Sequence, residues 1–439
     1  MSTASSARTA TPKKSSLGIF LLCWLAIVGD GYDLAVYGAT LPGFLGPENW
    51  GVTPTQAGVV GSIALVGMLV GSLVAGTLSD RIGRRRMLAI AVVTFSVFML
   101  ACAAAPDFTW FAAFRLLACL GIGGLLPVAV SVANEFASPE RKSIAVGLVL
   151  TAPAVGLLLA ATISMNVLPQ FGVRPVYAIG GLALLLVPFL LRSIPESPTF
   201  LRSQGREDEA ARIAAQYGLP EEAQTTRAIR ASGDGGARGS ALGGLAGLFR
   251  DGMASATVLI WVACVISLLT IFGLTTWLPQ IMRESGFGTS ASISFLIWYS
   301  VGAIGGTVIG SVVSQRTSPK FVMTVGFVAA AVALGSLLIG VSGPVLIVAV
   351  VLAGFGGMGT QNMLNDHVAQ YYPGHVRATG LGWALGVGRV GAIAGPYYGS
   401  LVIGTDGAIG AAALAFGVPA AIGVVVALLM PRRRKAPTV

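Results

Sequence analysis

The chain has 439 residues, of which 54% are hydrophobic and only 10% are charged, and its formal net charge is +10. A soluble domain has about 25% charged residues, so this composition excludes an ordinary soluble enzyme, a disordered chain and a disulfide scaffold. The four cysteines all lie in apolar stretches, which favours buried small side chains over metal or redox chemistry; they are Cys23, Cys102, Cys119 and Cys264.

Twelve apolar stretches follow one another along the chain, each close to the roughly 20 residues that a transmembrane helix needs. Those of the first half span residues 17–45, 54–79, 87–105, 108–134, 143–168 and 175–194. Those of the second half span residues 254–282, 290–314, 321–340, 343–366, 378–403 and 408–430. The first is too long for a cleaved signal peptide and contains two acids. The stretches predict an all-α membrane protein with twelve transmembrane helices.

The basic residues predict the orientation of these helices, because lysine and arginine stay on the cytoplasmic side. With the N-terminus inside, 24 of the 28 basic residues lie in the termini or in cytoplasmic loops. The positive charge therefore indicates topology rather than a nucleic-acid partner. We expect a multi-pass protein of the cytoplasmic (inner) membrane, surrounded by the lipid bilayer, with both termini cytoplasmic and no obligate protein partner.

One long polar stretch divides the chain, which predicts an N-terminal half (1–194), a cytoplasmic linker (195–252) and a C-terminal half (253–439). Within the linker, residues 207–217 are expected to form a short amphipathic helix, and residues 232–244 are rich in Gly and Ser, as in a flexible segment. A shift of 235 residues superimposes parts of the two halves, for example Gly71 on Gly306 and Ser79 on Ser314. Parallel repeats of this kind are typical of secondary transporters.

Several motifs resemble those of a known family. The segment from Gly76 to Arg85, GTLSDRIGRR, resembles the loop signature of the major facilitator superfamily and lies between the second and third spans. Further matches resemble its aromatic acid:proton symporter branch (benzoate, 4-hydroxybenzoate and protocatechuate type): they are Asp30-Gly-Tyr-Asp33, Arg115 with the glycines that follow it, Pro195-Glu-Ser-Pro198, and the run from Gln361 to Arg389. The resemblance implies the twelve-helix fold in two pseudo-symmetric halves. Two departures are Cys119, where the pattern has glycine, and Gln315, where the second loop copy lacks an acid.

Four ionisable residues lie well inside the predicted spans, where charges are costly and mark functional sites. They are Asp30, Asp33, Arg115 and Arg389. Depth along the helices places Arg115 at the level of the two acids, so we expect one of them to pair with it. The other acid is free to load and unload a proton, and which of the two titrates stays open. The alternative is a static ion pair that holds two helices together.

Arg389 lies near the midplane, where its guanidinium suits a substrate carboxylate; Arg115 is the second candidate. Flat aromatic side chains are expected to line the site, and amides to bind ring hydroxyls, although each is also compatible with core packing. The aromatic candidates are Tyr37, Trp277, Trp298, Tyr299 and Trp383, and the amides are Asn166, Gln361 and Asn362.

Charged residues near the cytoplasmic span ends form a second candidate set. Asp80 with Arg81 and Glu135 is expected to form a charge latch that closes the inner side, and the alternative is a solvated basic rim. The full set predicted for this gate is Gly76, Asp80, Arg81, Gly83, Arg84, Glu135, Arg141 and Asp366.

The sequence therefore predicts a proton-coupled transporter that imports a small aromatic carboxylate by alternating access. The class of substrate follows from the resemblance. We expect no catalytic residues, no metal and no cofactor. The alternatives are a proton-coupled carrier of another organic acid or metabolite, an exporter, and a membrane sensor that binds such a compound without moving it.

Overall fold

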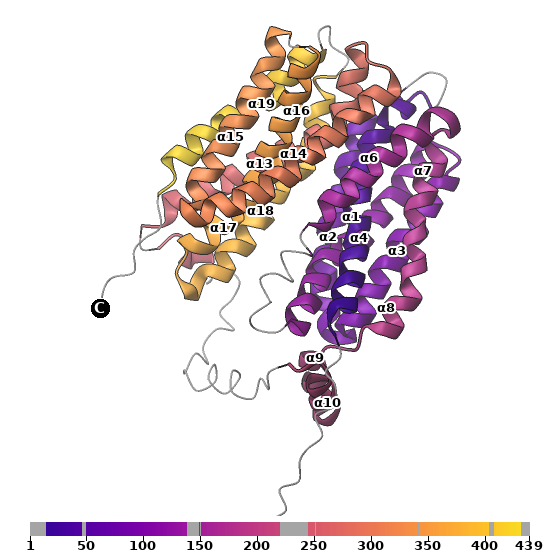
Figure 1. Ribbon diagram of the computed structural model, residues 1–439, viewed down its shortest axis with the longest axis vertical. Helices are drawn as coiled ribbons and strands as arrows, with labels where there is room; N and C mark the ends of the chain where they lie inside the picture. The colour runs from indigo at the N-terminus through magenta and orange to yellow at the C-terminus, as the bar shows by residue number, and fades with distance from the viewer. Residues whose placement is uncertain are drawn as a thin grey trace, which may run out of the picture.

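The computed structural model describes residues 15–45, 50–137, 149, 151–219, 245–250, 252–340, 342–403 and 408–431. Within these residues the chain is helical, without a strand, and it forms two bundles side by side (Figure 1). The first bundle contains α1 (Leu17–Phe44), α2 (Pro54–Ile82), α3 (Arg84–Ala104), α4 (Phe108–Phe136), α6 (Ala152–Phe171) and a sixth crossing made of α7 (Val173–Gly180), η1 (Gly181–Leu186) and α8 (Val187–Ser193).

The second bundle contains six crossings as well. They are α13 (Ala254–Glu284), α14 (Thr289–Arg316), α15 (Pro319–Ser336) with η2 (Leu337–Ile339), the broken crossing α16 (Pro344–Gly354), η3 (Phe355–Gly359) and α17 (Thr360–Tyr371), then α18 (Gly374–Ser400) and α19 (Ala408–Leu429). Eleven described crossings are long and apolar enough to span a membrane, and α18, with 27 residues, is the twelfth. The predicted twelve-helix fold is confirmed.

In the segment of the chain that connects the two bundles there are two short helices, α9 (Pro198–Ser203) and α10 (Glu207–Tyr217). They lie below the first bundle in Figure 1. The predicted amphipathic helix at 207–217 is confirmed by α10. The predicted flexible segment 232–244 lies outside the described residues. We call the end of the molecule that carries α9 and α10 the linker end.

Local sequence signals set where the helices begin. Thr53 caps α2 in a capping box with Gln56, while the Asp107 carboxylate accepts the N–H groups of Thr109 and Trp110 at the start of α4. Gly83 separates α2 from α3 with φ of 96°, a conformation that favours glycine. Two helices extend past the predicted apolar stretches: α3 begins at Arg84 instead of residue 87, with a basic first turn, and α17 ends at Tyr371 instead of residue 366.

The repeat is present in the arrangement of the helices. A shift of 235 residues carries α2 onto 289–317, the position of α14, and carries α3 onto 319–339, the position of α15 with η2. Close contacts between helices repeat as well. A Cβ at Gly71 would overlap the carbonyl of Leu120, and a Cβ at Gly306, its equivalent, would overlap the carbonyl of Phe355, the equivalent of Leu120. The same backbone crossing is thus built twice from glycine.

The halves contact each other at the end opposite the linker end. Arg283 at the end of α13 donates to the carbonyl of Pro42 in α1 at 2.8 Å, and Ser290 in α14 donates to the carbonyl of Met165 in α6 at 3.2 Å. Gly58 of α2 faces Ser400 of α18 with no room for a Cβ between them. These contacts close that end of the interface between the two bundles.

Candidate functional site

A cavity of about 210 Å³ lies between the two halves, from the middle of the molecule toward the linker end. Its walls are mostly apolar, with a few hydroxyl and amide groups among them. They come from α1, α4 and α6 in the first half and from α13, α14, η3 and α17 in the second: Leu34, Leu126, Thr151, Pro153, Ala154, Leu157, Leu268, Ile271, Phe272, Thr275, Ile304, Thr307, Val308, Met358, Gln361 and Asn362. An apolar pocket with few polar groups is the usual form of a small-molecule site.

Two of the predicted substrate residues line this cavity. Gln361 donates to the Asn365 side-chain oxygen at 3.0 Å, and its own Oε1 is buried without a hydrogen-bond partner among the residues that the structure describes. Asn362 donates to the Thr307 hydroxyl at 3.1 Å. Both follow the π-helical turn η3, whose glycines let this crossing depart from regular helix, as often happens at functional sites.

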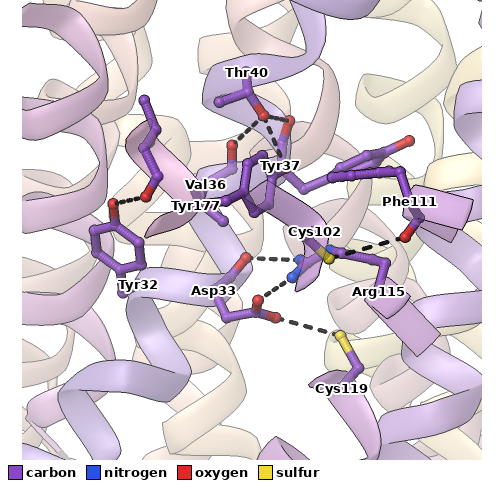
Figure 2. A network of polar contacts seen from close by, with 11 residues as sticks. Tyr32, Asp33, Val36, Tyr37, Thr40, Cys102, Phe111, Arg115, Cys119 and Tyr177 are labelled. Carbon is purple, nitrogen blue, oxygen red and sulfur yellow. Dashed lines mark hydrogen bonds and ion pairs between the residues drawn. The ribbon is translucent and has the colours of Figure 1, made fainter. Parts of the chain in front are cut away.

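The first half contains a buried ion pair between α1 and α4 (Figure 2). Arg115 of α4 donates through Nη1 to Oδ1 of Asp33 in α1 and through Nη2 to the Asp33 carbonyl at 2.9 Å. The other carboxylate oxygen, Oδ2, accepts the Cys119 thiol at 3.3 Å. The guanidinium also lies 5.6 Å from the centre of the Tyr37 ring, within the range of a cation–π contact. Asp33 is therefore the acid that pairs with Arg115.

The second acid has a different environment. Asp30 is 2% exposed, and its Oδ1 has no hydrogen-bond partner in the described part of the chain. It lies one helical turn before Leu34, which lines the cavity, so the two share a face of α1. Arg389 of α18 interacts electrostatically with Asp30 and donates through Nη1 to the Met68 sulfur at 3.4 Å. An acid of the first half and an arginine of the second half thus influence each other electrostatically, although neither side chain is among the residues that line the cavity.

The predicted aromatic lining is not found at this cavity among the described residues. Tyr37 donates its hydroxyl to the Ala57 carbonyl at 2.6 Å, and Trp277 donates Nε1 to the Pro396 carbonyl at 2.7 Å. Tyr299 is fully buried and lines a separate, much smaller apolar cavity inside the second half. Trp383 stacks on Trp261. In this arrangement the four side chains pack helices together.

The remaining predicted residues fall into two groups. Trp298 is exposed on α14, and Asn166 donates to the Thr162 carbonyl within its own helix. At the linker end, Asp366 accepts the Gln370 amide at 3.1 Å. Arg141 lies outside the described residues.

The charge cluster at the linker end is built differently from the prediction. Arg84 lies 3.1 Å from Asp80 and 3.5 Å from Glu135, and Glu135 accepts the Ser197 hydroxyl. Arg81 is exposed beside this cluster. The latch of Asp80 with Arg81 and Glu135 stays a prediction. In this arrangement Arg84 is the partner of Asp80, because residues four apart on a helix face each other, whereas adjacent residues do not.

The glycines of the loop signature have separate environments. A Cβ at Gly83 would meet the Glu196 carboxylate, which also accepts the Arg85 N–H at 3.2 Å. Gly76 has open space around it. The described cluster lies within the first half and joins α2, α3 and α4 to the segment before α9.

Sequence reasoning missed two contacts at the buried charges. Cys119 was noticed only as a departure from the family pattern, yet it donates to Asp33; its position four residues after Arg115 on α4 was the available signal. Met68 had no signal, because a methionine in an apolar helix is ordinary.

Two six-helix halves around a central cavity, with buried charges beside it, define a secondary transporter. The family model described as Major Facilitator Superfamily matches residues 23–396 and 313–439. The chain belongs to the major facilitator superfamily, and it is a multi-pass membrane transporter rather than an enzyme.

Relatives and solved structures agree with this assignment. The chain is 31% identical to the benzoate transport protein of Acinetobacter baylyi, over 95% of this chain and 90% of the relative. It is 30% identical to the 4-hydroxybenzoate transporter PcaK of the same organism, over 88% of this chain and 85% of the relative. Among solved structures, the xylose transporter XylE of E. coli matches with a TM-score of 0.74 at 18% identity, over 95% of this chain and 99% of that one.

Proposed function

We propose that this chain imports a small aromatic carboxylate, of the benzoate or hydroxybenzoate class, together with a proton. The observation that carries the proposal is the cavity between the halves, together with the buried Asp30, Asp33 and Arg115 and the half-buried Arg389 in neighbouring helices. Its volume of about 210 Å³ suits one aromatic ring, since an apolar cavity of about 150 Å³ binds benzene. Relatives named for benzoate and 4-hydroxybenzoate support the same class.

Each part of the site has a place in this proposal. The apolar walls hold the ring, Gln361 and Asn362 bind ring hydroxyls, and Arg389 binds the carboxylate, for which its planar fork is suited. Arg115 is the weaker candidate for the carboxylate because Asp33 already occupies it. Proton coupling is assigned to Asp30, Asp33 and Arg115 as a group.

Energetics favour import with a proton. An inside-negative potential opposes entry of an anion by about 2.3 kcal/mol per charge per 100 mV. A co-transported proton cancels that cost, and each unit of pH gradient adds about 1.4 kcal/mol of driving force.

The orientation follows the basic residues: the linker end faces the cytoplasm of a cytoplasmic membrane, with both termini inside. The contacts that close the opposite end then make this an inward-facing arrangement. The charge cluster around Arg84 and Glu135 lies at the cytoplasmic side, where it serves as the inner gate. The halves extend over 1–194 and 253–439, joined by a linker at 195–252.

The test is uptake of labelled benzoate and 4-hydroxybenzoate into proteoliposomes. We expect accumulation with an inward pH gradient, and its loss when a protonophore collapses that gradient. Arg389→Ala should weaken substrate binding. Binding without accumulation would indicate a sensor, and folded protein that binds neither compound would direct the search to other organic acids.

A further inference from the structure

The two buried acids of α1 differ in how fully their oxygens are used. Asp33 has a donor on each carboxylate oxygen, Arg115 on Oδ1 and Cys119 on Oδ2. Protonating Asp33 would remove the charge that compensates a buried arginine, a change that is costly in a dry interior. Asp33 is thus held as the ionised partner of Arg115.

Asp30 has no such donors. Neither a hydrogen bond nor an ion pair to its carboxylate exists among the described residues, although the side chain is almost completely buried. A buried carboxylate without donors readily exchanges its charge for a proton. Asp30 is therefore the acid whose surroundings tolerate both states.

Arg389 extends from the second half toward the first, and it also lacks a strong hydrogen-bond or ion-pair partner among the described residues. Its Nη1 donates to the Met68 sulfur, which is a weak acceptor, and its electrostatic partner is Asp30. A carboxylate within ion-pair distance of this guanidinium is missing from the described part of the chain. Arg389 is consequently positioned to accept a better anion than it has.

The other groups that face Asp30 do not change this balance. Asp33 on the same helix is neutralised by Arg115 of α4. α6 packs directly on α1, where a Cβ at Gly31 would overlap the carbonyl of Pro153, and it contains no charged residue. The charged residues of α13, Arg283 and Glu284, lie at its far end. Asp30 and Arg389 therefore remain as one titratable carboxyl group and one fixed cation that influence each other.

We propose that Asp30, and not Asp33, carries the transported proton, because the carboxylates of Asp30 and of the substrate compete for Arg389. This inference rests on the proposed function. With Asp30 ionised, its negative charge balances that of Arg389 without a direct ion pair, and the substrate anion is repelled. A proton from the outer side forms an O–H bond on Asp30, and the substrate carboxylate replaces it at Arg389. On the cytoplasmic side the substrate leaves, the O–H bond breaks, the proton goes to water, and Asp30 again neutralises Arg389.

The decisive experiment measures binding of benzoate to the purified full chain as a function of pH. Benzoate stays ionised between about pH 5.5 and 8.5, so any pH dependence belongs to the protein. For the wild type we expect affinity to fall by up to about tenfold for each pH unit above the range where Asp30 is protonated, as uptake of one proton with the ligand requires. Asp30→Asn should bind with little pH dependence and, near pH 8.5, more tightly than the wild type.

Asp33→Asn is the matched variant, and its benzoate affinity should still fall as pH rises. That change leaves Arg115 without its carboxylate partner, so the variant could fail to fold. Cys119→Ala is therefore a second control: it removes one donor to Asp33, keeps the ion pair, and should also keep the pH dependence. If Asp30 had only a structural role, Asp30→Asn would not bind benzoate more tightly than the wild type near pH 8.5. In proteoliposomes, Asp30→Asn should exchange substrate across the membrane but fail to accumulate it under a pH gradient.

The outcomes separate the two proposals. A folded wild type that binds no aromatic carboxylate would remove the proposed function. Wild-type binding with unchanged pH dependence in Asp30→Asn would overturn the role of Asp30 alone. Loss of pH dependence in folded Asp33→Asn would assign the proton to Asp33 instead.

Discussion

The two halves of this transporter share their helix crossings and differ in their buried charges. The glycines at the tight crossings correspond under the shift of 235 residues, as Gly71 and Gly306 do. The acids and the arginine do not: Asp33 and Arg115 correspond to Leu268 and Val350. The repeated positions specify the packing of the bundle, and the unrepeated positions carry the chemistry.

The second half contributes chemistry that the first half lacks. Arg389 corresponds to Ala154, and Gln361 corresponds to Leu126. Acid groups therefore come from one half, while the guanidinium that faces Asp30 and the cavity amides come from the other. Because the site is divided in this way, movement of one half against the other changes the electrostatic partners of both.

The largest loss of stability is expected when Arg115 of the first half is replaced by the residue at the equivalent position of the second half. Arg115→Val alone leaves Asp33 as an uncompensated buried charge, which should cost about 3–5 kcal/mol of stability. The double variant Asp33→Leu with Arg115→Val removes both charges and should recover most of that loss. Thermal unfolding in one detergent compares them. A double variant no more stable than Arg115→Val would show that the pair is needed for folding.

The glycine crossings should be equally sensitive in both halves. Gly71→Ala and Gly306→Ala each force a methyl group against a neighbouring backbone, for an expected loss of about 1–3 kcal/mol. Gly305→Ala is the matched control, because Gly305 has nothing within 4 Å of its Cβ position. Unfolding midpoints and folded yield measure the effect. Unequal losses at Gly71 and Gly306 would contradict the equivalence of the two crossings.

A smaller effect is expected at Trp277, which corresponds to Pro42 in the first half. Trp277→Phe loses the hydrogen bond to the Pro396 carbonyl, worth about 0.5–1.5 kcal/mol. Since Trp277 does not line the cavity, the KM for aromatic acids should stay the same, whereas Gln361→Ala should raise it. The KM of each variant is measured by transport kinetics in proteoliposomes. A raised KM in Trp277→Phe would show that Trp277 contacts the substrate.

The smallest effect is expected at Asp80. Its side chain is 71% exposed, so losing its ion pair with Arg84 in Asp80→Asn should change stability by at most about 1 kcal/mol. The reciprocal variant Gln315→Asp should gain nothing, because Pro319 stands where the first half has Arg84. Unfolding midpoints at low and high salt test both. A clear gain in Gln315→Asp would reveal a basic partner in the second half.

Composition and spacing were enough to predict the twelve crossings and the repeat, because both depend on properties summed over many residues. Depth along the helices also placed Arg115 level with the acids. The rotation of each helix about its own axis could not be predicted in this way. It decides that Arg84 rather than Arg81 meets Asp80, and that Trp277 points at α18 rather than into the cavity. The pairing of helix faces depends on packing that single-residue patterns do not specify.

The four cysteines have a practical consequence for following this protein at work. All are buried as free thiols, so water-soluble maleimides should leave the native chain largely unlabelled. Single cysteines introduced at exposed helix ends then accept spin labels or fluorophores without a cysteine-free background, and Cys119 stays in place beside Asp33. Distances between two such probes, one on each half, would record opening and closing with all four native cysteines in place.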